Sequence, residues 1–383
     1  MAKLKKILSA VLCAAMAMHL TGCWDYHEIE MYSIVSGIAV DKGQNGYKYH
    51  VTIEYLNISG DINENQNKAL TVEADGDTVF DAERESLKKN DKKFYFSNCK
   101  ILLISEDIAG DGLKQLLDWF MRDAELRTTI EVVVSKEKTA GEILHAQSKN
   151  QDPIAFQIKN IISDASYFDA AGQSLQLYEI VDILNTPGEE VSLPGIRLKN
   201  DNGVTSLELM PNAVFKSGRL IGWLSDEQSK YYMFARDRIN GGIIVTGMSP
   251  GKNDIALEIF KNRTYITPIV EGSKVTVRLD VETTAGYAEE NSNQNYLDMY
   301  GIAAVEKRAD ATLKEGITDV ISAVTKQYGS DIFGFGKAVY DKYPSVWEKL
   351  SQSGGNPLGK MNFEVNTNVK IINTAVTSKK GGD

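Results

Sequence analysis

Cys23 is the residue whose surroundings best prepare it for covalent chemistry. It ends the run Leu20-Thr21-Gly22-Cys23, in which a small residue precedes the cysteine. A small side chain gives a peptidase access to the bond before Cys23, and the freed cysteine can carry acyl chains through its thiol and its amine. We therefore predict cleavage after Gly22 and lipidation of Cys23 by S-diacylglycerol, with or without an N-acyl chain.

The segment before Cys23 has the order of a secretory signal. Lys3, Lys5 and Lys6 precede an apolar run over 7–20, which is shorter than the roughly 20 residues that a transmembrane helix needs. With Gly22 and Cys23 at its end, the leader resembles a lipoprotein signal peptide over 1–22. Two acyl chains hold a protein stably on a bilayer, so this anchor needs no membrane-spanning helix.

The charge of the mature chain excludes some partners. Three of the 42 basic residues lie in the leader and none of the 52 acidic residues do, which leaves a mature net charge of −13. Nucleic-acid binding needs clustered basic side chains that neutralise phosphates, and surface contact with anionic lipid needs them too. We expect no nucleic-acid partner, and we expect the lipid on Cys23 to be the only membrane contact apart from protein partners.

The other cysteines and the histidines form no metal-binding pattern. Cys13 leaves with the leader, and Cys99 stands alone in a strand-like run, where a lone cysteine is typically a small buried hydrophobe. His27, His50 and His145 are not at metal-ligand spacing. We expect no disulfide, no metal and no cofactor.

One motif favours catalysis at first sight. Gly247-Met248-Ser249-Pro250-Gly251 matches the Gly-x-Ser-x-Gly elbow of hydrolases. The elbow uses the backbone N–H after the serine for its oxyanion hole, and Pro250 has none. We interpret the motif as a hairpin turn and predict no catalytic residue.

Two further segments have plain structural interpretations. Gly334-Phe335-Gly336 lacks the third glycine of a dinucleotide-binding loop and is interpreted as a flexible corner between helices. The acidic pair Glu189-Glu190 is interpreted as solvated. It lies in a stretch over 185–195 that is rich in proline and glycine, which indicates a linker.

Hydrophobic periodicity predicts strands and helices in mixed order in the first half of the chain. The expected strands cover 34–41, 47–55, 94–104 and 131–135, and the expected helices cover 77–89 with Asp77 as N-cap, 112–123, 154–164 and 174–185. The first two strands should form a hairpin. The strand, helix, strand order over 94–135 indicates a parallel pair with a crossover.

The second half predicts a sheet with helices. The expected strands cover 192–199, 204–210, 213–224 as a hairpin, 242–247, 254–261, 274–284 and 361–375. Ser225-Asp226-Glu227-Gln228 forms a capping box for a helix that runs to about Arg238. A long helix over 294–328 and a shorter one that starts at Asp331 and stops at Pro344 follow. Loops are expected over 57–69.

These patterns predict an α+β, multidomain protein with mixed sheets flanked by helices after a cleaved lipoprotein signal peptide. The chain is too long for one core. We place the signal peptide at 1–22, an N-terminal α/β region of one or two subdomains at 23–195, a C-terminal α+β domain at 196–376 and a polar tail at 377–383.

Four motifs in order resemble one protein family. They are Gly22-Cys23-Trp24-Asp25 with Glu28 and the strand 34–41, Ala213-Val214-Phe215-Lys216 with the run 220–224, the run 331–336 with Pro344 and Trp347, and the closing strand. They are similar to the Ger(x)C lipoproteins, the C subunits of bacterial spore germinant receptors. Tyr26-His27 departs from the more Arg-rich stretch expected there.

The resemblance implies a fold of unusual topology and a non-enzymatic role. It implies a lipid-anchored subunit on the outer face of the inner spore membrane that acts with membrane A and B subunits to trigger germination by nutrients. It leaves open whether this subunit contacts the nutrient. The alternatives are a solute-binding lipoprotein of a transporter, which the unlike halves disfavour, and an extracytoplasmic hydrolase, which Pro250 disfavours.

Overall fold

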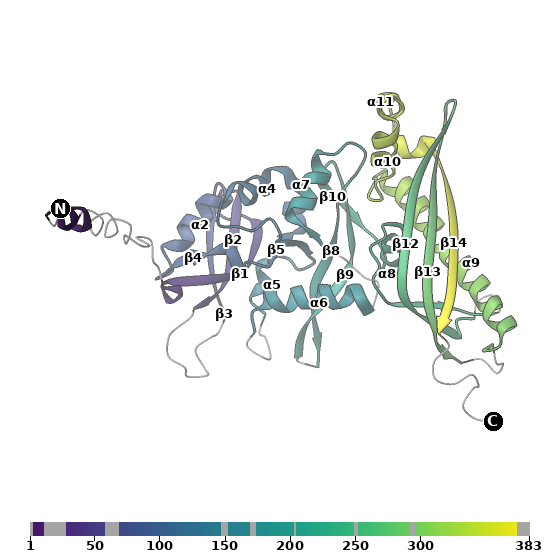
Figure 1. Ribbon diagram of the computed structural model, residues 1–383, viewed down its shortest axis with the longest axis horizontal. Helices are drawn as coiled ribbons and strands as arrows, with labels where there is room; N and C mark the ends of the chain where they lie inside the picture. The colour runs from purple at the N-terminus through teal and green to yellow at the C-terminus, as the bar shows by residue number, and fades with distance from the viewer. Residues whose placement is uncertain are drawn as a thin grey trace.

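Two sheets form the body of the protein (Figure 1). The computed structural model describes residues 3–10, 28–57, 69–146, 152–168, 174–202, 204–248, 252–291 and 296–373. Over these residues the chain builds a ten-stranded sheet and then a four-stranded sheet, each covered by helices. The α+β prediction with mixed sheets is confirmed. Cys23, the leader after residue 10, most of the loop over 57–69, Ser249 with Pro250, and the tail over 377–383 lie outside the described residues.

The first sheet has the strand order β10-β9-β8-β6-β5-β1-β2-β3. These strands are β1 Tyr32–Lys42, β2 Tyr49–Asn57, β3 Ala69–Gly76, β5 Ile101–Ser105, β6 Glu131–Ser135, β8 Ser192–Asp201, β9 Val204–Lys216 and β10 Arg219–Trp223. β1, β5, β6 and β8 run parallel, and antiparallel hairpins flank them on both sides. β5 and β6 are buried at every residue, as parallel strands covered on both faces should be.

Helices lie on both faces of this sheet (Figure 1). One face carries α2 Val79–Leu87, α3 Glu106–Asp111, α4 Leu113–Arg122 and α7 Leu177–Asn185, and the other carries α5 Gly141–Leu144 and α6 Ile154–Phe168. The predicted apolar face of α4 is confirmed, because Leu113, Leu116, Leu117 and Phe120 are its buried residues. Short β4 Lys93–Tyr95 pairs with the start of β1, and β7 Leu175–Gln176 pairs with β6.

The second sheet has the order β11-β12-β13-β14. Its strands are β11 Ile243–Thr246, β12 Ile255–Glu271, β13 Lys274–Glu290 and β14 Met361–Asn373, and its helices are α8 Asp226–Ala235, α9 Met299–Ala323, α10 Phe335–Lys342 and α11 Pro344–Gln352. β11 to β13 are antiparallel, and β14 returns parallel to β13. α9 covers one face with Val305, Ala309, Leu313 and Ile317 in the core.

Some local expectations differ from the structure. Thr78, not Asp77, is the N-cap of α2, since its hydroxyl oxygen accepts from the Asp81 N–H. The strand expected over 94–104 is interrupted by a 3-10 turn at Phe96–Asn98, so Cys99 lies between β4 and β5. Pro344 was expected to stop the helix before it, but it also begins α11. The first residue of a helix has no intrahelical partner for its N–H, so proline, which lacks this group, is tolerated there.

The first sheet extends past the predicted domain boundary. The predicted boundary between 195 and 196 falls inside β8, and the first sheet continues to Trp223 in β10. Pro194-Gly195 resembles a linker in sequence, but in the structure it forms a bulge in the β8–β9 pairing. Among the described residues, no helix has the length and apolar composition to cross a membrane.

Candidate functional site

The structure does not place the predicted lipidation site. Cys23 lies outside the described residues, and the body begins at a 3-10 turn over Ile29–Met31 that leads into β1. The site that the structure does assemble lies where the two sheets meet. Three segments converge there. They are the stretch 186–191 before β8, the end of α8, and the loop from Ser330 to Gly334 before α10.

Arg236 ties these three segments together. Its guanidinium donates to the Phe333 carbonyl at 2.6 Å and to Glu189 Oε1 at 2.7 Å. The side chains of Arg236 and Glu189 are only 17% and 7% exposed, so the ion pair is shielded from water and salt. The prediction that Glu189 is solvated is wrong, because folding brings it a cation that lies 47 residues away along the chain.

Asp331 fixes the loop that Arg236 contacts. Its carboxylate accepts the Phe335 N–H at 3.0 Å and the Gly336 N–H at 2.6 Å, which satisfies donors at the start of α10. Its backbone carbonyl accepts from the Glu190 N–H at 2.9 Å. Burial raises the pKa of Asp331 to about 7, against the lowering effect of these backbone donors and of Arg236.

Glycines allow this close approach. Gly188 and Gly334 have φ values of +79° and +76°, a region that L-residues rarely adopt. A Cβ on Gly188 would lie 2.5 Å from the backbone carbon of Gly336, and a Cβ on Gly336 would lie 2.5 Å from the Trp347 ring. The Lys337 N–H donates to the Gly188 carbonyl at 2.8 Å. The expected flexible corner over 334–336 is therefore a packed contact between the two parts of the protein.

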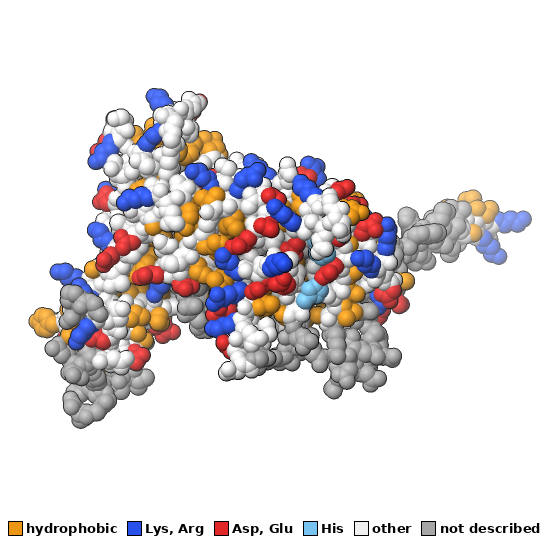
Figure 2. All heavy atoms as spheres, turned by 180° about the vertical axis from the view of Figure 1, so that it is seen from behind, with side chains coloured by type: hydrophobic (Ala, Val, Ile, Leu, Met, Phe, Trp, Pro, Cys, Tyr) orange, Lys and Arg blue, Asp and Glu red, His pale blue; other side chains and the backbone are white. Residues whose placement is uncertain are grey.

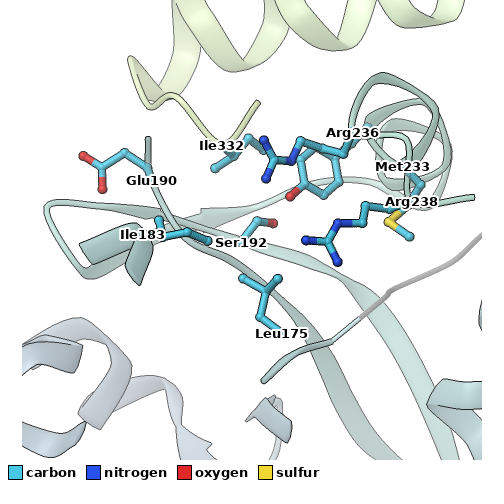
Figure 3. A pocket seen from close by; sticks show the side chains of 9 residues that line it. Leu175, Ile183, Glu190, Ser192, Met233, Arg236, Arg238 and Ile332 are labelled. Carbon is cyan, nitrogen blue, oxygen red and sulfur yellow. The ribbon is translucent and has the colours of Figure 1, made fainter. Parts of the chain in front are cut away.

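The space at this junction is mostly filled. Figure 3 shows Arg236 and Arg238 extending over the strand that carries Ser192, with Ile332 beside Arg236. The cavity between them is about 10 Å³, room for no more than about one water molecule. An adjoining hollow of about 690 Å³ is wider, but Arg238 there pairs with Glu179 at 3.1 Å. The inner cavity is thus too small for an organic ligand, and the arginines that line it bond within the protein.

Two other buried carboxylates act in the same way as Asp331. Asp41 accepts the N–H groups of Ala140 and Gly141 at 2.6 and 2.9 Å, at the start of α5. Glu54 accepts those of Ile154 and Ala155 at 2.6 and 3.0 Å, at the start of α6. Burial raises the pKa of both carboxyls. These acids hold helix starts against the first sheet.

Two histidines that are distant in sequence meet at one acidic side chain. His50 Nε2 lies 3.5 Å from Glu73, His145 Nε2 contacts the other oxygen of Glu73, and His50 Nδ1 lies 3.0 Å from Asp75. Figure 2 shows the two histidines side by side among acidic side chains. Sequence spacing could not show this, because β2, β3 and the end of α5 bring them together. Within the described ranges, no group of three or more His, Cys, Asp or Glu side chains is arranged to hold a metal ion.

The remaining sequence candidates have structural roles where they are described. Cys99 is buried, and burial raises the pKa of its thiol to about 12, so it is a poor nucleophile. Gly247 follows β11, which pairs antiparallel with β12, in agreement with the predicted hairpin. Arg308 of α9 donates to the Gly247 carbonyl at 2.9 Å.

Comparison with known proteins decides the family. One family model, described as the spore germination protein N-terminal domain, matches residues 25–198. A second, described as spore germination B3/GerAC like, C-terminal, matches residues 212–375. The chain belongs to the Ger(x)C family of spore germination proteins. In this Ger(x)C chain the N-terminal domain precedes the C-terminal domain, in the same order as the sequence motifs.

Relatives align over nearly the whole chain. Spore germination protein KC of Bacillus subtilis (strain 168) is 25% identical over 375 residues, which cover 91% of this chain and 91% of that protein. Spore germination protein B3 of the same organism is 22% identical, over 95% of this chain and 97% of that protein. A solved structure described as the GerBC protein matches with a TM-score of 0.57 and 18% identity, over 91% of this chain and 100% of that chain. At that identity the likeness shows the fold alone.

Proposed function

We propose that this protein is a non-enzymatic, lipid-anchored C subunit of a nutrient germinant receptor, which acts with membrane A and B subunits to trigger spore germination. The observation that carries the proposal is the match of both spore germination domains over residues 25–198 and 212–375. The relatives that match over 91–97% of their own length are named spore germination proteins.

The anchoring part of the proposal rests on the leader and Cys23. The lipoprotein signal and the small residue before Cys23 support attachment of acyl chains at this position. The lipid would hold the protein on the outer face of the inner spore membrane, where two integral subunits can bind it. The alternative of a transporter's solute-binding lipoprotein is not favoured, since such proteins have two similar lobes and the two sheets here are unlike.

Replacing Cys23 by alanine tests the anchor. In Cys23→Ala the attachment atom is absent, so we expect the protein to move from the membrane to the soluble fraction and germination through this receptor to be lost. The measurements are immunoblots of fractionated spores and germination in the nutrient. The control is Cys99→Ala, which removes the other cysteine of the mature chain and should leave the protein on the membrane. Membrane retention of Cys23→Ala, or normal germination without retention, contradicts the anchoring claim.

The partners are tested by recovery from spore membranes. The protein, solubilised in mild detergent and captured through a C-terminal tag, should bring down an A and a B subunit in comparable amounts. Recovery of a transporter ATPase and permease instead would overturn the receptor assignment.

A further inference from the structure

The turn that opens the folded body exposes apolar side chains. Residues Ile29–Met31 form a 3-10 turn with no buried residue, although two of its three residues are apolar. Ile29 and Met31 are 56% and 57% exposed. β1 follows directly at Tyr32, so these side chains lie at the start of the first sheet.

Two tyrosines extend this apolar surface. β4 pairs in parallel with β1, which sets Tyr32 opposite Lys93 and Ile34 opposite Tyr95. The rings of Tyr32 and Tyr95 lie 5.7 Å apart, and Tyr95 is 39% exposed. We name Ile29, Met31, Tyr32 and Tyr95 the tip. Tyrosine is enriched at the boundary between lipid headgroups and acyl chains, because its ring is apolar and its hydroxyl is polar.

The tip lies beside the predicted anchor. Five residues lie between Cys23 and Ile29, and even a fully extended chain over these six steps spans only about 20 Å. In Figure 1 the start of β1 lies at one end of the long axis of the body, and the second sheet lies at the other. Acyl chains on Cys23 would therefore hold the end of the body that carries the tip close to the bilayer surface.

We propose that the tip docks into the interfacial layer of the membrane leaflet that holds the lipid of Cys23, so that the protein contacts the bilayer through its surface as well as through its acyl chains. This inference rests on the lipid anchoring proposed above. It revises the expectation that the lipid alone makes the membrane contact. Two points of attachment at one end set the body upright, with the second sheet directed away from the membrane.

The charges around the tip make this contact apolar rather than electrostatic. Lys93, which lies opposite Tyr32 in the β1–β4 pairing, pairs with Glu125 at 2.5 Å. Glu28 and Glu30 flank Ile29 and are exposed. With Lys93 paired and two carboxylates beside Ile29, anionic lipid gains little at this turn. Docking should thus be insensitive to salt and to the anionic fraction of the lipid.

A fluorophore in the turn tests the proposal on the lipidated full-length protein. Glu30→Cys in a Cys99→Ala background is labelled with nitrobenzoxadiazole, and the protein is reconstituted in phosphatidylcholine vesicles with and without phosphatidylglycerol. We expect a blue-shifted emission and quenching by a shallow nitroxide lipid, unchanged by high salt. The same label at Tyr300→Cys, a position 81% exposed on α9, should show neither.

Apolar substitutions in the tip supply the matched comparison. Ile29→Ser/Met31→Ser should lower the ratio of docked to undocked protein by about tenfold, since two half-exposed apolar side chains lose their burial in lipid. Ile243→Ser/Tyr265→Ser, a similarly exposed pair on the second sheet, should leave the signal unchanged. Vesicle flotation is measured in parallel. Protein that floats without a shifted spectrum overturns docking and leaves the anchor intact, whereas protein that does not float overturns both.

Discussion

At the residue scale, three buried acids hold the starts of helices. Asp41, Glu54 and Asp331 each accept two consecutive backbone N–H groups at the start of a helix. A carboxylate suits this task because it offers two acceptor oxygens and a charge that favours the helix N-terminus. Their raised pKa values come from burial. A perturbed carboxyl is a common mark of an active site, but here the geometry assigns each one to the backbone.

Asp331 should make the stability depend on pH. Its pKa rises from 3.8 to about 7 on folding, so between these values the folded state binds the proton more tightly. The free energy of unfolding should therefore fall as pH rises through this window, by up to about 1.4 kcal/mol per pH unit. Asp331→Asn removes this titration and should flatten the slope. Urea unfolding at pH 5, 6 and 7 measures it, and identical slopes in both proteins would refute the prediction.

The same substitution should also lower stability at every pH. An amide has one acceptor oxygen for the two donors of Phe335 and Gly336, and its NH₂ group would face one of them. We expect a loss of about 1–3 kcal/mol.

At the element scale, close contact between turns joins the two parts of the protein. Gly188 lies against Gly336 with no side chain between them, and Gly334 takes a left-handed conformation before α10. Backbone hydrogen bonds run from Lys337 to Gly188 and from Glu190 to Asp331. Such contacts have little room to adjust, because the nearest atoms belong to the backbone.

Gly188→Ala should therefore be more destabilising than an ordinary glycine substitution. Its Cβ would meet the Gly336 carbon at 2.5 Å and the Lys337 nitrogen at 2.7 Å. The control is Gly272→Ala in the β12–β13 hairpin, which has a similar φ of +61° and no atom within 4 Å of its Cβ. The control should cost about 1 kcal/mol from backbone strain, and Gly188→Ala about 1–3 kcal/mol more from overlap. Equal losses in thermal unfolding would show that the contact is not tight.

Several elements were predictable from local patterns, and the reason is physical. The β1–β2 hairpin, the apolar face of α4 and the Ser225 capping box each depend on residues close in sequence. The interpretation of Pro194-Gly195 as part of a linker did not show its local structure, because only the partner strand β9 shows that it forms a bulge. The function was predicted from the family motifs, because the sequence analysis identified no catalytic, metal-binding or cofactor-binding residues.

The junction and the histidine contact could not be predicted in the same way. Arg236 and Glu189 look like ordinary surface residues until packing removes water from both. His50 and His145 meet on Glu73 only because β3 lies next to β2. The glycines at 188, 334 and 336 are the sequence feature that could have indicated close backbone packing at the junction. They were interpreted instead as parts of a linker and a flexible corner. Lipidation of Cys23 stays a prediction from the leader.

At the scale of the whole molecule, β9 belongs to both parts. Val214 packs in the core of the second part, and its neighbours Ala213 and Phe215 pack in the core of the first. The Ser330 hydroxyl donates to the Phe215 carbonyl, and the Tyr328 hydroxyl donates to the Trp223 carbonyl at 2.8 Å. Because neighbouring residues of one strand serve two cores, the two parts should lose structure together.

The ion pair of Arg236 and Glu189 should be energetically coupled. Arg236→Ala leaves a shielded carboxylate without its cation and should cost about 3–5 kcal/mol. Glu189→Ala added to it should cost little more, since the unpaired charge is then gone. A double-mutant cycle by chemical denaturation gives the coupling energy. Effects that simply add would show that the two side chains do not depend on each other.

The parallel pairing of β14 with β13 has a consequence for how the chain acquires its structure. Partners on these strands, such as Arg278 and Glu364, are 86 residues apart, and α9 packs against both through one core. Because β14 follows β13 and α9 in the chain, this sheet cannot close until β14 has been synthesised. Until then β13 keeps an unpaired edge, which is a template for misassembly. The second half of the protein is thus the part that most needs protection until β14 has paired.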